Sequence, residues 1–263
     1  MRARVQLAAK MDCHLGRRSL LLGRLPHPQR SLFVMGKRIL LVGASGLVGQ
    51  GVLNVLCSAP EVTQVVALVR HPLAVADRKT RVLQVADFSQ ASLAQIDLGG
   101  LDACLYCAGP LPLGMSEATY REATVGVLER VVHAYARANP AGCVVYVSGA
   151  GANPSSRLMP LRVKGEAEAM LRHAGIAHTS LRPGVVRPVL GEQSPHGLRR
   201  RVYTLGAPLL ALGTKAMPSV FTTTRDIGDC MLRWVLTGAA RPEVIENAGI
   251  QFAGTASWWD AGQ

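Results

Sequence analysis

The chain has 263 residues, of which 49% are hydrophobic and 17% are charged. This length and apolar fraction suit one globular domain with a well-developed core, and they exclude a chain that is mostly disordered. The net charge is +12, but residues 1–34 contribute half of it, and the Arg-Arg-Arg run at 199–201 has no interleaved aromatic residues, so nucleic acid is not an expected partner.

Residues 1–34 differ from the rest of the chain. They carry seven basic side chains against one acid, and they lack both strong periodicity and the long apolar segment of a secretory signal. One interpretation is a mitochondrial presequence, if the source is eukaryotic. Another is an unstructured extension created by the choice of start codon, since Met35 leads directly into an apolar strand. We expect the domain to cover 35–255, with a tail at 256–263, in the cytoplasm or the mitochondrion.

No segment of the sequence predicts a transmembrane helix. The apolar stretch 39–56 is interrupted by glycines. The uncharged stretch 202–213 is too short to span a bilayer, which needs about 20 residues. We therefore expect no membrane partner.

From Lys37 onward, short apolar strands alternate with helical segments. Strands that are apolar on both faces and alternate with helices indicate a parallel sheet covered on both sides. The sequence therefore predicts an α/β fold with a doubly wound parallel sheet, the Rossmann fold, as a single domain with a small C-terminal substrate-capping segment at about 185–225. The predicted strands are Arg38–Val42, Gln64–Val69, Arg81–Val85, Asp102–Cys107, Gly142–Val147 and His178–Leu181, and the predicted helices are Leu47–Cys57, Ser116–Asn139, Leu161–Ala174 and Asp226–Leu236.

A glycine-rich loop joins the first predicted strand to the first helix. A glycine triplet alone is weak evidence, but here a strand precedes it, a helix follows and a further strand comes next. Glycines in this place allow a tight turn and let a pyrophosphate approach the helix N-terminus closely, so the loop predicts a dinucleotide site. The alternative is a turn that is tight for packing alone. The loop consists of Gly43, Ala44, Ser45, Gly46, Leu47, Val48 and Gly49.

The end of the second strand distinguishes NAD from NADP. An acid there would bind the ribose 2′-hydroxyl, whereas this sequence has Arg70. A guanidinium suits a 2′-phosphate, and no acid competes with it, so NADP(H) is the expected cofactor and NAD(H) is less favoured. The alternative is an exposed arginine at a strand end without a ligand.

Two further strand ends would border the cofactor. Asp87 and Phe88 follow the third strand, where the adenine would lie. Cys107, Ala108 and Gly109 end the fourth strand, where a turn of small residues would let the cofactor pass.

The cysteines do not predict a metal site. Cys104 and Cys107 have CxxC spacing, but they belong to a predicted strand, where an offset of three places them on opposite faces. No second cysteine pair completes a zinc site, and the histidines show no ligand spacing. We interpret these cysteines as buried thiols in a reducing compartment.

These motifs together resemble the short-chain dehydrogenase/reductase superfamily. The similarity is greatest to its atypical branch, which includes the Tat-interacting-protein oxidoreductases and epimerase/dehydratase-like NAD(P)-binding proteins. The resemblance covers about Lys37 to Phe252, and it implies that Pro183 and Gly184 border the cofactor. It is carried by Val-Gly-Ala-Ser-Gly-Leu-Val-Gly at 42–49, Tyr-Val-Ser-Gly at 146–149, Arg-Val-Lys-Gly-Glu-Ala-Glu at 162–168, Leu-Arg-Pro-Gly at 181–184 and Asp-Ile-Gly at 226–228.

The resemblance also implies a catalytic site at Ser148 and Lys164. In the family, the serine orients the substrate carbonyl, while the lysine binds the nicotinamide ribose and lowers the pKa of a tyrosine four residues before it. Here that position is Pro160, which has no hydroxyl and is expected in the first turn of its helix. Ser155, Ser156 or Tyr203 are the candidates to replace the phenol.

Three functions follow from this pattern. The leading one is an NADP(H)-dependent oxidoreductase acting on a small carbonyl or alcohol. The alternative is a non-catalytic NADP(H)-binding regulator or assembly factor, and a third is sugar-nucleotide epimerase or isomerase chemistry, which would also require the absent tyrosine. We expect a small-molecule substrate as partner, and a monomer or homodimer. The expected substrate wall, unless it is a plain packing segment, contains Leu190, Tyr203, Leu209 and Leu212.

Overall fold

The computed structural model describes residues 36–75, 77–192, 220–237 and 242–252. Within these ranges a seven-stranded sheet has the order β3-β2-β1-β4-β5-β6-β9, and every neighbouring pair is parallel. Two short strands, β7 and β8, pair separately. The strands are β1 (Lys37–Val42), β2 (Val62–Val69), β3 (Thr80–Gln84), β4 (Ala103–Tyr106), β5 (Cys143–Val147), β6 (Ala177–Arg182), β7 (Val185–Arg187), β8 (Phe221–Thr223) and β9 (Val244–Glu246).

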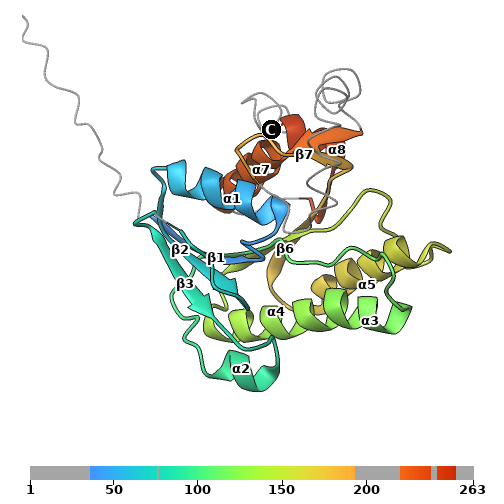
Figure 1. Cartoon of the computed structure of the whole chain (residues 1–263), viewed down its shortest axis with the longest axis horizontal. Coiled ribbons are helices and arrows are strands. Elements are labelled where there is room, and N and C mark those ends of the chain that lie inside the picture. Colours follow the sequence, from blue (N-terminus) through green and yellow to red (C-terminus); the bar gives the residue numbers. More distant parts are fainter. Residues whose placement is uncertain (1–35, 76, 193–219, 238–241, 253–263) are drawn as a thin grey trace, which may run out of the picture. The chain divides into compact units, whose positions relative to one another are not determined.

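Helices cover both faces of the large sheet, as the doubly wound plan requires (Figure 1). One face carries α1 and α7, and the other carries α2, α3, α4 and α5. The predicted α/β Rossmann fold is therefore confirmed. The helices are α1 (Leu47–Ser58), α2 (Gln90–Ala94), α3 (Glu117–Arg121), the π-helical turn η1 (Glu122–Gly126), α4 (Val127–Ala138), α5 (Met159–His173), α7 (Thr224–Thr237) and α8 (Asn247–Phe252).

The interior strand β1 separates two hydrophobic cores. Ile39 and Leu41 pack on the side of α1 and α7, whereas Leu40 and Val42 pack on the side of α4. All four side chains are fully buried. A strand enclosed on both faces cannot alternate apolar with polar residues, which explains its continuous apolar run. Cys104 and Cys107 also lie in opposite cores, as their spacing in a strand predicts.

The observed elements depart from the predicted ones in two respects. The helix predicted over Ser116–Asn139 is interrupted by the π-helical turn η1, a feature that periodicity does not report. The short elements α2, β7, β8, β9 and α8 were not predicted, because a few residues carry too weak a pattern.

Several expectations fall partly outside the described residues. These include the extension at 1–34, the tail at 256–263 and most of the capping segment, together with Tyr203, Leu209 and Leu212. Among the described residues, no helix is both long and apolar enough to cross a membrane. Within the same part of the chain, no group of three His, Cys, Asp or Glu side chains is arranged to hold a metal ion.

Candidate functional site

The glycine loop lies at the carboxyl end of β1. Gly43 adopts φ +88°, and a Cβ atom there would lie 2.5 Å from the backbone nitrogen of Ala108, so both its conformation and its surroundings require glycine. The amide of Gly46 donates to the carbonyl oxygen of Gly43 at 3.0 Å and closes the turn. Gly46 is the N-cap of α1, and no side chain caps the helix. The first N–H groups of α1 are therefore available to an anion such as a pyrophosphate.

The absence of a side chain has different consequences at Gly49 and at Gly46. A Cβ atom on Gly49 would overlap the carbonyl oxygen of Gly43, which is backbone and cannot move aside. A Cβ atom on Gly46 would meet only that same oxygen, at 3.4 Å, an ordinary contact. Gly49 thus serves packing, whereas Gly46 leaves open space in front of the helix.

We expect Gly49→Ala and Gly46→Ala to separate these two roles. Gly49→Ala should lower the unfolding free energy of the cofactor-free protein by about 1–3 kcal/mol, the usual effect of overpacking. Gly46→Ala should leave that stability unchanged and still weaken NADPH binding, because its methyl group occupies the space for the pyrophosphate. Urea denaturation and calorimetric titration measure the two effects. Unchanged NADPH affinity in Gly46→Ala would show that the cofactor does not approach this loop.

Arg70 and Phe88 come together beside the glycine loop's strand. Arg70 directly follows β2 and is exposed, and its guanidinium carbon lies 5.8 Å from the centre of the Phe88 ring. Arg70 takes part in none of the ion pairs between described residues. By contrast, Arg130 of α4 donates to the carbonyl oxygen of Phe88 at 2.8 Å and to Glu122 at 2.6 Å. Arg70 is therefore the cation here with no carboxylate partner, beside an aromatic ring.

Asp87 lies in the same region but uses one carboxylate oxygen locally. That oxygen accepts hydrogen bonds from the Ser89 amide at 2.9 Å and from the Ser92 hydroxyl at 2.6 Å. The hydrogen bonds from Ser89 and Ser92 lower the pKa of Asp87 to about 2. Asp87 thus helps to begin α2, and only its other oxygen remains for a ligand.

The turn after β4 provides space beside the glycine loop. The Cys107 amide donates to the carbonyl oxygen of Val42, which keeps β4 next to β1 at the strand ends. The Cys107 thiol points into the core, 4.0 Å from the sulfur of Met231, and burial raises its pKa to about 12. A Cβ atom on Gly109 would meet no atom within 4 Å. The small residues of this turn therefore leave an open passage.

Ser148 and Lys164 meet at the carboxyl end of β5. The Lys164 ammonium donates to the carbonyl oxygen of Ser148 at 2.8 Å and, more weakly, to that of Val147 at 3.5 Å. The same ammonium lies 5.6 Å from the centre of the Tyr146 ring. Burial lowers the pKa of Lys164 to about 8, and the nearby Glu168 carboxylate opposes this shift. The hydroxyl of Ser148 is buried without a hydrogen-bond partner.

Pro160 occupies the first turn of α5, as predicted, one helical turn before Lys164. The hydroxyl of Ser156 accepts a hydrogen bond from the Leu158 amide, so it belongs to the loop before the helix. Ser155 is exposed on that loop. Among the described residues, the hydrogen bonds of Lys164 go to Val147 and Ser148 and not to either of these serines. Tyr203 lies outside the described residues.

Two buried tyrosines beneath the site were not predicted. Tyr106 ends β4 and Tyr146 lies near the end of β5, with ring centres 6.0 Å apart. Both hydroxyls are buried without a partner, as is the hydroxyl of Thr124 in η1. Burial raises the pKa of both phenols above its ordinary value. Buried polar atoms without partners are rare and often mark a functional site or a water. The Tyr-Val-Ser-Gly motif was the available signal for Tyr146.

Pro183 and Gly184 follow β6 and connect it to neighbouring segments. The carbonyl oxygen of Pro183 accepts from the Ala150 amide at 2.9 Å, and the Gly184 amide donates to the Asn247 side chain at 2.7 Å. A Cβ atom on Gly184 would overlap the backbone of Val220. This packing alone is enough to require glycine at 184, so the glycine is not itself evidence of a cofactor contact.

A buried ion pair at the end of β6 was also missed. Arg182 donates to both carboxylate oxygens of Glu168, at 3.0 and 2.6 Å, and to Glu246 at 2.8 Å. The Glu168 side chain is only 2% exposed. Since Glu168 belongs to α5 and Glu246 to β9, this arginine clamps three elements together at the carboxyl edge.

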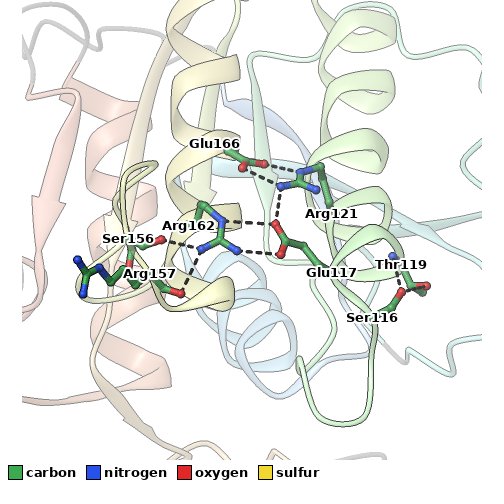
Figure 2. Close-up of polar contacts among 8 residues, drawn as sticks. All are labelled: Ser116, Glu117, Thr119, Arg121, Ser156, Arg157, Arg162 and Glu166. Carbon is green, nitrogen blue, oxygen red and sulfur yellow. Dashed lines mark hydrogen bonds and ion pairs between the residues drawn. The ribbon is translucent and has the colours of Figure 1, made fainter.

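A second network holds α5 against α3 (Figure 2). Glu117 accepts hydrogen bonds from Arg121 at 2.7 Å and from Arg162 at 2.8 Å, and Arg121 also pairs with Glu166 at 2.7 Å. Arg162 in addition donates to the carbonyl oxygen of Ser156 at 2.7 Å. These contacts fix both the helix that carries Lys164 and the loop before it.

A cavity of about 980 Å³ lies at the opposite edge of the sheet. Lys37, Asp102 and Cys143 line it, and each lies at or next to the amino end of its strand. In open α/β sheets, ligands bind at the carboxyl ends. The cavity is therefore separate from the candidate site.

A parallel sheet with an uncapped glycine turn at the carboxyl end of its first strand, β1, defines a Rossmann-type dinucleotide-binding protein. The chain belongs to the NAD(P)H-binding family, because its residues 43–197 match the sequence pattern of that family. It is 30% identical over 173 residues to the mitochondrial protein FMP52 of Candida albicans, covering 63% of this chain and 74% of that protein. It is 29% identical over 193 residues to FMP52 of Saccharomyces cerevisiae, covering 69% and 77%.

Solved structures of low sequence identity share this fold. Uronate dehydrogenase from Agrobacterium tumefaciens superposes with a TM-score of 0.59 at 16% identity, covering 81% of this chain and 76% of that one. A short-chain dehydrogenase family protein from Francisella tularensis gives 0.58 at 13%, covering 83% and 99%. An ADP-L-glycero-D-manno-heptose-6-epimerase from Helicobacter pylori gives 0.58 at 18%, covering 81% and 77%. The NAD(P)H-binding family and the Rossmann fold inferred from the motifs are thereby confirmed.

Proposed function

We propose that the protein is an NADP(H)-dependent oxidoreductase that transfers a hydride to or from a small carbonyl or alcohol substrate. The observation that carries this proposal is the pairing of Lys164 with Ser148. A partly buried ammonium and a buried, unpartnered hydroxyl meet at the same sheet edge as the uncapped helix α1. Such a pair provides a cation for the ribose and a donor for a substrate oxygen.

The residues present fit the cofactor. Gly46 leaves the N-terminus of α1 open for the pyrophosphate, and Arg70 offers a guanidinium with no carboxylate partner for the 2′-phosphate. When bound, the reduced nicotinamide supplies the hydride. The Ser148 hydroxyl would donate to the substrate carbonyl oxygen and orient it, while the positive charge of Lys164 would lie beside the ribose hydroxyls.

The second candidate is a regulator or assembly factor that binds NADP(H) without turnover. Pro160 favours it, because the family's proton donor is absent from α5. NADPH consumption with a panel of aldehydes and ketones distinguishes the two functions. Tight NADPH binding without oxidation by any of these carbonyls would favour the regulator. Under either function, the names of the fungal relatives favour a mitochondrial over a cytoplasmic location. A monomer or homodimer without a membrane or nucleic-acid partner stays a prediction.

Arg70→Ala tests the choice of cofactor. A charge-assisted hydrogen bond contributes about 1.5–3 kcal/mol, so NADPH should bind about tenfold or more weakly, at 1.4 kcal/mol per decade. NADH affinity should stay nearly the same. Arg81→Ala is a matched control, since Arg81 is also exposed but lies at the amino half of β3. Titration of both cofactors measures the effect. Equal weakening of NADH and NADPH would mean that Arg70 acts through the fold.

A further inference from the structure

The structure leaves few proton donors near the expected position of the substrate carbonyl. Pro160 has no hydroxyl, and Ser156 is engaged in its own loop. Tyr146 presents its ring to the Lys164 ammonium, and its side chain is among those that are fully buried. Among the described residues at this strand edge, the Ser148 hydroxyl is assigned to orienting the substrate oxygen, and Lys164 is the group left to supply its proton.

The contacts of Lys164 leave it one donor to spare. Its ammonium has three N–H groups, and the structure directs two of them at the carbonyl oxygens of Ser148 and Val147. The stem of the side chain is packed, because a Cβ atom on Gly149 would lie 3.2 Å from the Lys164 Cδ atom. The ammonium is therefore held in place, with one N–H group directed at no protein acceptor in the described residues.

The surroundings of Lys164 also favour release of its proton. The acid of its own helix that acts on its charge, Glu168, also accepts hydrogen bonds from Nε and Nη2 of Arg182, so a second cation shares this carboxylate. Among the described residues, the phenol that faces the ammonium is that of Tyr146 on β5, and Tyr106 on β4 and Tyr120 on α3 lie near that phenol in turn. A cation held between a phenol ring and carbonyl dipoles loses part of its hydration. This burial is what lowers the pKa of Lys164 to about 8, close to neutral pH.

We propose that Lys164 is the general acid of the reduction, in place of the missing tyrosine, and donates the proton that the substrate oxygen gains. This inference rests on the proposed oxidoreductase function. In the balanced step, the hydride forms a bond to the carbonyl carbon as the C=O π bond breaks. The freed electron pair on oxygen takes a proton from the Lys164 Nζ atom. The nicotinamide is oxidised, the carbonyl is reduced, and the neutral amine regains a proton from water.

The decisive variant is Lys164→Arg, which keeps a cation for the ribose but does not release its proton at any accessible pH. We expect kcat for carbonyl reduction to fall by about 10²–10⁴-fold, the usual contribution of a positioned general acid, while the Kd for NADPH changes by no more than about threefold. Lys164→Met should lose both turnover and affinity. Lys79→Arg is the matched control, because Lys79 also donates to a carbonyl oxygen, that of Ala59, but far from the site at the start of β3.

A readout that does not depend on turnover is the titration of the Lys164 amine. The pH dependence of its acetylation, followed by peptide mass spectrometry, should show a midpoint near pH 8 in the cofactor-free protein. Wild-type kcat for reduction should be flat below about pH 8 and fall above it as the ammonium deprotonates, and this alkaline limb should be absent from Lys164→Arg.

Three outcomes would overturn the inference. If the Lys164→Arg variant reduced carbonyls at the wild-type rate, Lys164 would not be the general acid, while the proposed oxidoreductase function would stand. An amine that remains protonated above pH 10, as an ordinary lysine does, would contradict the inference whatever the turnover. Failure of the wild-type protein to oxidise NADPH with any carbonyl would instead reject the proposed function, and the inference with it.

Discussion

Glu168→Ala is expected to destabilise the folded protein by about 3 kcal/mol, the lower end of the range for breaking a buried ion pair. The substitution removes the carboxylate that accepts two hydrogen bonds from Arg182. Arg182 keeps only the exposed Glu246 as partner, which is why we expect the lower end of the range. The midpoint of urea denaturation, at constant slope, measures the change.

A neighbour on the same helix provides the control for Glu168. Glu166 also pairs with an arginine, Arg121, but both side chains are partly exposed, at 29% and 43%. Exposed pairs contribute about 0–1 kcal/mol, so Glu166→Ala should have a small effect. A loss of stability in Glu168→Ala as small as the about 0–1 kcal/mol expected for Glu166→Ala would show that Arg182 is satisfied without Glu168, and that its clamp on α5 is weak.

Pro160→Tyr is expected to raise carbonyl reduction, by up to about 10²-fold, because it places a phenol one helical turn before Lys164. The helix should tolerate the change, since Pro160 lies in its first turn, where proline is favoured but not required. The neighbouring ammonium should lower the pKa of the new phenol and make it a competent acid. Steady-state kinetics at saturating NADPH measures the effect.

Pro160→Phe separates the hydroxyl from the ring in this experiment. The phenylalanine variant should reduce carbonyls no faster than the wild-type protein. In the double variant Pro160→Tyr with Lys164→Arg, the phenol should restore part of the rate lost in Lys164→Arg alone. Fast wild-type reduction that falls in both Pro160 variants would mean that the site delivers its proton from another direction.

Much of the fold could be predicted from local sequence. The apolar run of β1 and the glycine turn after it carry strong signals, because a strand buried on both faces has few polar positions and Gly43 needs a positive φ. The opposite faces of Cys104 and Cys107 follow from strand geometry alone. The place of Pro160 in the first turn of α5 follows from its missing N–H group.

The missed features depend on partners that are distant in the sequence. Arg182 belongs to a motif that was recognised, but its carboxylates come from α5 and from the three-residue strand β9. The close packing of Gly184 against the backbone of Val220 is a further contact that its own motif does not reveal. Propensity and periodicity describe a residue's own segment, so they do not report contacts of this kind.

The position of Glu246 and Asn247 near the end of the described chain has a consequence for synthesis on the ribosome. The glycine loop and the helix of Lys164 emerge early, yet Arg182 and the Gly184 amide find these two partners only when the segment after residue 243 has left the exit tunnel. Until then the sheet lacks its last strand, and the nascent chain exposes the edge of β6 that does not pair with β5. A nascent chain that stalls before this point would display its glycine loop while this edge of the sheet is still open, and exposed strand edges of this kind are bound by chaperones.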